Sequence, residues 1–351
     1  MSEIDAPTKP APQRPPEGRP TLKTIAFMTG LGVTTVSRAL KDAPDIGEAT
    51  KKRVRLVADQ IGYRPNRAGV RLRTGKTNVI SLVLNTEEQI MGLTSSMIQG
   101  ISDELAGTPY HLVVTPYTHA GDPMDPVRYV VETGSADGIV LSRTEPEDPR
   151  VRYLHEKNMP FVTHGRTEMG IEHAYHDYDN AAFARDAVAM LARLGRSRIL
   201  LLGPPTNLTY ARHMMEGFEE GILENDLRPF PTPSFTIDDD IQAIADGVRK
   251  LMQSERRPDG IVCGAGSAGI AAAIGAEQAG LTLGNEVDIV TKQSSFDMLT
   301  WFRPGILVIS EDFKLAGRDL ARKVLSRIEG TPATDLQTLA YTPPAREPET
   351  A

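Results

Sequence analysis

Residues suited to contacting DNA are concentrated near the amino terminus of the 351-residue chain. Thr34, Ser37 and Arg38 fall on the outer face of a predicted helix over residues 33–40. An arginine guanidinium matches the O6/N7 edge of guanine in the major groove, and Ser and Thr hydroxyls suit DNA phosphates. Residues 21–76 carry a net charge of +8, whereas the whole chain carries −7. Such a basic head on an acidic body is typical of a protein that binds phosphates.

Two more predicted helices complete the element that positions these side chains. Thr21 is placed to cap a helix over residues 22–29, and Gly30-Leu31-Gly32 turns the chain sharply. A third helix is predicted over about residues 48–61. The predicted inward-facing residues are Leu22, Ile25, Ala26 and Met28 in the first helix, Val36 and Leu40 in the second, and Thr50, Val54, Val57, Ala58 and Ile61 in the third. The outer face of the third helix carries Lys51, Lys52, Arg53 and Arg55. The pattern fits a helix-turn-helix, although a small helical bundle with solvated charges shares this periodicity.

Two other motifs suggest chemistry but lack the context that it requires. Residues 264–269 read G-x-G-x-x-G, but a dinucleotide site also needs an acid after the next strand, and Glu286 and Asp288 precede that strand. His173 and His176 would point to opposite faces of a strand, which argues against a metal site. No Ser-His-Asp arrangement falls on a plausible nucleophile elbow. The sequence therefore predicts no enzyme, no metal and no cofactor.

From residue 78 onward, short apolar runs alternate with amphipathic helices. Buried parallel strands are predicted at residues 79–84, 111–115, 138–141, 161–163, 199–202, 234–237, 260–263, 288–291 and 306–309. Helices are predicted at about residues 181–194, 210–224, 241–253, 267–278 and 313–328. Two consecutive sets of βα units imply two similar lobes, with ligands bound at the carboxyl ends of the strands. The last strand and helix are expected to return to the first lobe.

Four short motifs near the amino terminus carry a family resemblance. They are Thr21-Leu22-Lys23-Thr24-Ile25-Ala26, Gly30-Leu31-Gly32, Thr35-Val36-Ser37-Arg38-Ala39-Leu40 and Gly62-Tyr63-Arg64-Pro65-Asn66-Arg67. Together, without gaps over residues 21–73, they resemble the start of the lactose/galactose repressor (LacI/GalR) family of bacterial transcriptional regulators. The resemblance implies an all-α helix-turn-helix head with a hinge helix, followed by a two-lobed α/β domain like that of periplasmic sugar-binding proteins.

The resemblance also implies which residues contact DNA. Val33 and Thr34 fall where the family reads operator bases, and Arg38 falls where an arginine contacts guanine. Leu72 falls on the apolar wedge that the hinge helix inserts into the minor groove. The other implied DNA contacts are Thr21, Leu22, Thr35, Ser37, Thr50 and Asn66. Gly69 should weaken the hinge helix, so we expect this helix to fold only on the operator.

An effector site in the cleft is implied as well. Its expected residues are Thr94, His164, Arg166, Arg212, Ala265, Gln293 and Trp301. Arg212 matches the arginine that clamps sugar hydroxyls, and its guanidinium can donate two hydrogen bonds to vicinal hydroxyls or to a carboxylate. Gly165, Ala265 and Gln293 replace the family's usual Asp, Asn and Asp.

The loss of carboxylates from the cleft leaves two hypotheses for the effector. It is either a larger saccharide held partly by aromatic contacts, with Phe235 and Trp301 as candidates, or an acidic or phosphorylated molecule matched to Arg166, Arg212 and Lys292. In both cases the resemblance implies a repressor of carbohydrate uptake or catabolism genes whose operator affinity depends on a sugar or sugar-derived effector.

Composition also bears on the cellular compartment, on membrane association and on the oligomeric state. The single cysteine, Cys263, excludes a disulfide framework and fits a reducing compartment. No apolar run approaches the length of a membrane span, so we expect no membrane association and a cytoplasmic protein. The carboxyl-terminal residues contain several prolines and no leucine heptads, which predicts a homodimer without a tetramerising coiled coil. A two-fold dimer implies a near-palindromic double-stranded operator.

The expected domain boundaries follow from these changes in pattern. A proline-rich tail is predicted at residues 1–20, the helix-turn-helix at 21–63, and the hinge helix and linker at 64–77. The effector-binding and dimerisation domain is predicted at 78–338, followed by a carboxyl-terminal tail at 339–351.

Overall fold

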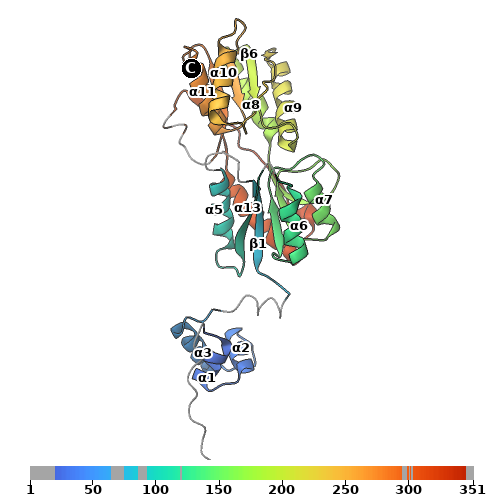
Figure 1. Ribbon diagram of the computed structural model, residues 1–351, viewed down its shortest axis with the longest axis vertical. Coiled ribbons are helices and arrows are strands. Elements are labelled where there is room, and N and C mark those ends of the chain that lie inside the picture. Colours follow the sequence, from blue (N-terminus) through green and yellow to red (C-terminus); the bar gives the residue numbers. More distant parts are fainter. Residues whose placement is uncertain are drawn as a thin grey trace, which may run out of the picture. The chain divides into compact units, whose positions relative to one another are not determined.

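The computed structural model describes residues 20–64, 75–85, 93–118, 121–294, 299, 301 and 303–344. The chain divides into two compact units, Met1–Thr77 and Asn78–Ala351, and each is described by itself (Figure 1). Residues 1–19 of the expected tail lie outside the described residues, as do the hinge positions Asn66, Gly69 and Leu72.

The first unit contains the three helices that the sequence predicts. They are α1 (Leu22–Thr29), α2 (Val33–Leu40) and α3 (Glu48–Gln60), packed around Ile25, Ala26, Val36, Ala39, Val54 and Ala58. Thr21 caps α1 as expected, because its hydroxyl accepts a hydrogen bond from the Thr24 N–H while the Thr24 hydroxyl accepts one from the Thr21 N–H. Gly30 ends α1 with a φ of 67°, which glycine adopts without strain.

Two residues of this unit differ from the prediction. Met28 was expected to face inward, but it is 49% exposed, and Thr29 is buried in its place. Thr29 lies one turn after Ile25, and its hydroxyl donates a 2.7 Å hydrogen bond to the Ile25 carbonyl, so the polar side chain is satisfied inside the core. Lys51 was expected on the outer face of α3, but it is buried because its ammonium reaches Asp42 and Glu48.

The first lobe of the second unit is built on a parallel six-stranded sheet in the order β11-β5-β4-β3-β1-β2. The strands are β1 (Val79–Asn85), β2 (His111–Tyr117), β3 (Gly138–Leu141), β4 (Phe161–His164), β5 (Ala174–Tyr178) and β11 (Gln337–Ala340). Helices α5 (Leu93–Leu105) and α13 (Phe313–Glu329) pack against one face of the sheet, and α6 (Met124–Thr133) and α7 (Pro149–Glu156) pack against the other. Both faces of the central strands are therefore buried, which explains their continuous apolar runs in the sequence. The strand at residues 111–115 was also predicted to be buried, but β2 is an edge strand, and its Val113 and Val114 are exposed.

The second lobe repeats this arrangement with a parallel sheet in the order β10-β9-β8-β6-β7. Its strands are β6 (Arg198–Leu202), β7 (Arg228–Pro229), β8 (Gly260–Cys263), β9 (Asp288–Ser294) and β10 (Ile306–Glu311). Helices α8 (Asn180–Arg193) and α9 (Thr209–Glu224) cover one face, and α10 (Ile241–Met252) and α11 (Gly266–Gln278) cover the other (Figure 1). The predicted two-lobed α/β fold is confirmed.

Four strands differ from the prediction. β5 is absent from the predicted buried strands, but it lies between β4 and β11 in the first sheet and is largely buried. β10 was expected in the first lobe but pairs with β9 of the second, so of the predicted last strand and helix only α13 returns to the first lobe. No strand forms at residues 234–237, and the short β7 lies upstream, before Pro231 and Pro233, which cannot donate to a ladder. β11 was not predicted; a short 3₁₀ helix (Ala333–Asp335) precedes it, and it reaches Ala340, two residues beyond the expected end of the domain at residue 338.

Two glycines allow α5 and α13 to lie side by side, as Figure 1 also shows. A Cβ atom on Gly317 would collide with the backbone carbonyl of Met97, and one on Gly100 would collide with that of Lys314. Because backbone atoms cannot rotate away, the two helices would have to separate.

We therefore expect Gly317→Ala to lower the free energy of unfolding of the full chain by about 1–3 kcal/mol, the usual cost of overpacking. Urea unfolding of both proteins measures this difference. Gly121→Ala is the control, since a Cβ there meets only ordinary contacts with Thr118. Equal stability of the two variants would contradict the proposed close packing.

Candidate nucleic-acid interface and ligand cleft

The outer face of α2 carries the side chains that the sequence assigns to base reading. Val33, Thr34 and Arg38 are exposed, while Thr35 and Ser37 are half-buried. Thr21 is exposed at the start of α1, and Leu22 and Thr50 are half-buried. A short helix with an exposed arginine and flanking hydroxyls can enter a major groove and donate hydrogen bonds to bases and phosphates.

Arg38, the principal candidate for reading bases, forms an ion pair with Asp45. An Nη2–Oδ1 distance of 2.5 Å joins Arg38 to Asp45 in the segment between α2 and α3, and both side chains are about half exposed. An exposed pair of this kind contributes little to stability. It does mean that the Arg38 guanidinium must leave a carboxylate before it can pair with guanine.

Three of the four basic residues of α3 have structural partners. Lys51 lies 3.0 Å from Asp42 and 2.9 Å from Glu48, and Arg55 lies 2.8 Å from Asp42. Hydrogen bonding and charge from Lys51, aided by Arg55, lower the pKa of Asp42. Arg53 donates to the carbonyl of Thr29 and so ties α3 to the end of α1. Much of the positive charge of α3 thus stabilises the head itself.

The carboxyl ends of strands from both lobes meet in a group of charged side chains, which we call the junction cluster. It consists of His164, Arg166, Asp177, Lys292 and Glu311. Glu311 of the second lobe is buried; its carboxylate lies 2.8 Å from the Lys292 ammonium and 3.5 Å from His164 Nε2 of the first lobe. Arg166 lies 3.3 Å from Asp177.

Lys292 is held from several sides at once. Its ammonium donates a 2.7 Å hydrogen bond to the side-chain oxygen of Asn180 at the start of α8. The rings of Tyr178, Phe183 and Tyr210 have their centroids 5.0–5.8 Å from the same nitrogen. Together with Glu311, these neighbours compensate a buried cation by charge, hydrogen bonding and ring quadrupole.

The environment shifts the two buried carboxyls of the junction cluster in opposite directions. Burial raises the pKa of Asp177 to about 6, even though Arg166 opposes the rise. Burial would also raise the pKa of Glu311, but Lys292 and His164 outweigh it and hold this pKa well below its usual range. Glu311 is therefore a fixed anion, while Asp177 titrates near neutral pH.

Further ion pairs cross between the lobes around this cluster. Glu168, which follows β4, lies 2.5 Å from Arg212 and 3.6 Å from His213 on α9. Arg143, which follows β3, pairs with Asp238 of the second lobe. A backbone bond of 2.9 Å also runs from the Thr209 N–H to the Thr144 carbonyl. A molecule entering between the lobes would have to compete with these contacts.

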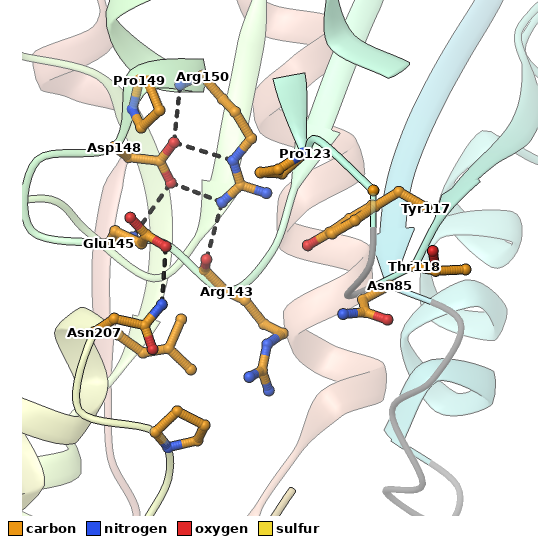
Figure 2. Close-up of a pocket in the computed structure, with 13 residues that line it drawn as sticks. Asn85, Tyr117, Thr118, Pro123, Arg143, Glu145, Asp148, Pro149, Arg150 and Asn207 are labelled. Carbon is orange, nitrogen blue, oxygen red and sulfur yellow. Dashed lines mark hydrogen bonds and ion pairs between the residues drawn. The ribbon is translucent and has the colours of Figure 1, made fainter. Parts of the chain in front are cut away.

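A cavity of about 220 Å³ lies beside these contacts, and we call it the rim cavity (Figure 2). The first lobe contributes Asn85, Tyr117 and Arg143 from or just after the carboxyl ends of β1, β2 and β3. The second lobe contributes Asn207 and Leu208 from the segment between β6 and α9. Asn207 donates a 2.9 Å hydrogen bond to Glu145 across the cavity wall.

The structure brings together some of the expected effector residues and separates others. His164 and Arg166 lie in the junction cluster. Arg212 pairs with Glu168, which follows β4, the strand that ends at His164. Ala265 occupies the N-cap position of α11, Gln293 lies in β9, and both are buried. Thr94 is half-buried in the first turn of α5, and Trp301 is 80% exposed. The expected effector contacts of all seven residues stay predictions, and none of the seven lines the rim cavity.

Sequence reasoning missed the acids that pair with these cations. Asp177 and Asp238 were not predicted to pair with cations of the cleft. Glu168 and Glu311 received no role. The pairs join residues far apart in the chain, for example Arg143 with Asp238, so no local spacing could reveal them.

The alternative chemical motifs have structural explanations. His173 is buried, and its ring nitrogens contact Thr163 and Thr167, whereas His176 contacts Asp319. Across the described ranges of the chain, no three His, Cys, Asp or Glu residues come together in a way that could hold a metal ion. Among the described helices, none has both the length and the apolar character needed to cross a membrane.

A helix-turn-helix unit followed by a two-lobed α/β domain defines a class of ligand-responsive DNA-binding proteins. Residues 78–342 match the family model described as periplasmic binding proteins and sugar binding domain of LacI family. Residues 21–66 match the model described as bacterial regulatory proteins, lacI family. The chain therefore belongs to the LacI family of bacterial regulatory proteins.

Individual relatives agree with this assignment. The chain is 28% identical over 323 residues to the HTH-type transcriptional regulator AglR of Rhizobium meliloti (strain 1021), a match covering 88% of this chain and 87% of AglR. The structure of a transcriptional regulator CelR–cellobiose complex has a TM-score of 0.65 at 22% identity, covering 92% and 97% of the two chains. The lac repressor dimer bound to operator and the anti-inducer ONPF has a TM-score of 0.79 at 17% identity, covering 92% and 96%. These two structures share the fold.

The Arg38–Asp45 pair leads to a prediction about DNA affinity. Asp45→Asn removes the carboxylate that competes with DNA for Arg38, so we expect tighter operator binding. The gain should be about 1.4- to 5-fold, because exposed ion pairs are worth about 0.2–1 kcal/mol. Fluorescence anisotropy with labelled operator measures it.

Asp59→Asn near the end of α3 is the matched control, since it removes the same charge from another exposed position of the head. If both variants gain affinity equally, the effect is one of net charge and the Arg38 pair has no particular role.

The raised pKa of Asp177 leads to a prediction about pH. Because the pKa is higher in the folded protein, this carboxyl favours folding below its unfolded pKa near 3.8, and the contribution is lost as pH rises through about 6. The melting temperature of Asp177→Asn relative to that of the parent protein should therefore increase from pH 4.5 to pH 6.5, and the difference between the two should be constant at higher pH. Thermal unfolding of both proteins across this range measures the difference, and a constant difference would contradict the shift.

Proposed function

We propose that this chain is a cytoplasmic, dimeric transcriptional regulator that represses carbohydrate uptake or catabolism genes. Its operator affinity is set by a saccharide bound between the two lobes. Membership of the LacI family supports this function, as do a relative that is a transcriptional regulator, a related structure that holds cellobiose and another that is a dimer on its operator.

The observation that supports the proposal most strongly is that one chain has both a surface suited to DNA and a ligand cleft. The helix-turn-helix exposes Arg38 and Thr34 on the face of α2, where they can read bases. The two-lobed domain is bridged by ion pairs such as Glu168–Arg212 and Arg143–Asp238, which a ligand must reorganise. Ligand binding that changes these pairs changes the lobe arrangement and thereby DNA affinity, and the coupling is reciprocal.

The charge pattern of the cleft favours a neutral saccharide over an acidic effector. The acidic alternative depends on Arg166, Arg212 and Lys292, but each of these cations already lies within 3.3 Å of a carboxylate oxygen. An anionic ligand would therefore have to displace an internal anion, whereas hydroxyl groups can hydrogen-bond to a paired guanidinium and carboxylate together. Of the two aromatic candidates, Phe235 packs against Gly247 of α10, and Trp301 is largely exposed.

Selection of random duplex DNA by the full-length protein at physiological salt tests this function, with and without a pool of neutral sugars and sugar phosphates. We expect a near-palindromic site whose recovery changes with a neutral sugar. Arg38→Ala should weaken binding to that site by about 1–3 kcal/mol and relax one base position in each half-site. Recovery of no consensus sequence would overturn the proposed function.

A further inference from the structure

Three consecutive residues of the first lobe each bind a residue of the second lobe. They belong to the segment that follows β3, which we call the contact loop (residues 142–145). The pairs are Arg143 with Asp238, Thr144 with Thr209, and Glu145 with Asn207. The hydrogen bonds of Thr144 and Glu145 are both 2.9 Å long. These contacts between the lobes therefore depend on the backbone conformation of one short loop.

The contact loop has a conformation that its residue types do not favour. Arg143 has a φ of 55°, in the left-handed region that residues with a Cβ atom rarely adopt. A residue persists in such a conformation only where its surroundings hold it there. In this conformation the Arg143 guanidinium donates two hydrogen bonds to the Asp238 carboxylate, and the two side chains are only 11% and 13% exposed. The first lobe must therefore contain groups that stabilise the loop in this shape.

A buried ion pair at the start of α7 holds the backbone of the contact loop. It joins Asp148, which caps α7, to Arg150, and the two side chains are 0% and 4% exposed. Arg150 Nε and Nη2 bind the Asp148 carboxylate at 3.0 and 2.7 Å. The same Nη2 donates to the carbonyls of Ser142 at 3.2 Å and Arg143 at 2.9 Å, the second of which is drawn in Figure 2. The Glu145 N–H donates to the Asp148 carboxylate at 3.2 Å. The pair thus fixes three backbone groups of the loop.

The Asp148–Arg150 pair acts on the second lobe only through the contact loop. Within the described part of the chain, every hydrogen bond that these two side chains form lies in the first lobe. A buried ion pair is costly to desolvate and is by itself weak evidence for a stabilising role. Here both charges are used to orient backbone groups, which gives the pair a function in addition to stability.

We propose that Asp148 and Arg150 are positioning residues for the contact between the lobes. Their ion pair holds the contact loop in the left-handed conformation that fits the second lobe, so its loss loosens the lobes although neither residue binds the second lobe. The consequence for regulation rests on the proposed function: a looser contact loop changes how strongly an effector alters operator affinity.

Hydrogen exchange of the Thr209 amide in the full-length protein, without sugar or DNA, tests this proposal. Thr209 is the first residue of α9, so its N–H has no acceptor within the helix, and the Thr144 carbonyl of the contact loop is its partner. Arg150→Lys keeps the charge, but an ammonium lacks the planar fork that binds the carboxylate and both carbonyls together. We expect the Thr209 amide to exchange roughly fivefold faster or more, the factor that one net hydrogen bond is worth, while the amides of β3 keep their protection.

Arg152→Lys is the matched control, since Arg152 lies on the same helix, is 53% exposed and pairs with Glu147. It should leave the exchange of the Thr209 amide unchanged. Asp238→Asn is a second test that leaves the interior of the first lobe intact. Because the contact loop binds as a unit, this change should also accelerate exchange at Thr209. Combined with Arg150→Lys, it should accelerate exchange by less than the product of the two single effects, since both act on one loop.

Unchanged exchange at Thr209 in Arg150→Lys would overturn the positioning role. Equal acceleration of the Thr209 amide and the β3 amides would also overturn it, because that result marks a general loss of stability. If Arg150→Lys does not fold, Asp238→Asn decides: faster exchange at Thr209 supports a loop that binds as a unit, and unchanged exchange overturns it. Since no sugar or DNA is present, failure here leaves the proposed function intact, and failure to recover an operator removes only the regulatory consequence.

Discussion

The buried carboxylate of Glu311 is the constraint on which the arrangement between the lobes depends. It lies at the end of β10, the last strand of the second sheet, immediately before the chain crosses to α13 on the first sheet. A buried charge is tolerated only when it is paired. Lys292 from β9 and His164 from β4 supply that pairing, so one side chain joins strand ends of both sheets at the point where the chain crosses.

The need for a charged side chain to be paired becomes weaker toward the solvent. Glu311 and Lys292 have side chains only 4% and 10% exposed, whereas Arg212 and Glu168 are 51% and 31% exposed. Breaking the inner pair leaves an uncompensated buried charge, while water can satisfy both members of the outer pair. The inner pair is thus a fixed connection, and the outer pairs are the ones that ligand hydroxyls can replace at low cost. A ligand that replaces the outer pairs can therefore change lobe contacts while the pair at the crossover stays in place.

Local pattern was enough to predict the helices and most strands, because each depends on periodicity within a few residues. The capping of α1 by Thr21 and the turn at Gly30 follow from residue type alone. The errors concern partners distant in sequence. β10 reads as an ordinary apolar strand, and only its pairing with β9 assigns it to the second lobe. The family resemblance led to the prediction that Arg212 contacts the effector. The pairing of Glu168 with Arg212 and the rim cavity depend on which loops meet in three dimensions, and no spacing in the sequence encodes that.

The helix-turn-helix shows why net charge alone is a poor measure of DNA contacts. Its excess of basic residues suggested a broad phosphate-binding surface, yet Asp42, Asp45 and Glu48 hold Lys51, Arg55 and Arg38. Lys51 is buried and cannot neutralise a phosphate without unfolding the loop that it supports, whereas Arg38 is exposed and can exchange its carboxylate for guanine. The acids therefore divide the basic residues into those that stabilise the head and those that are available to DNA.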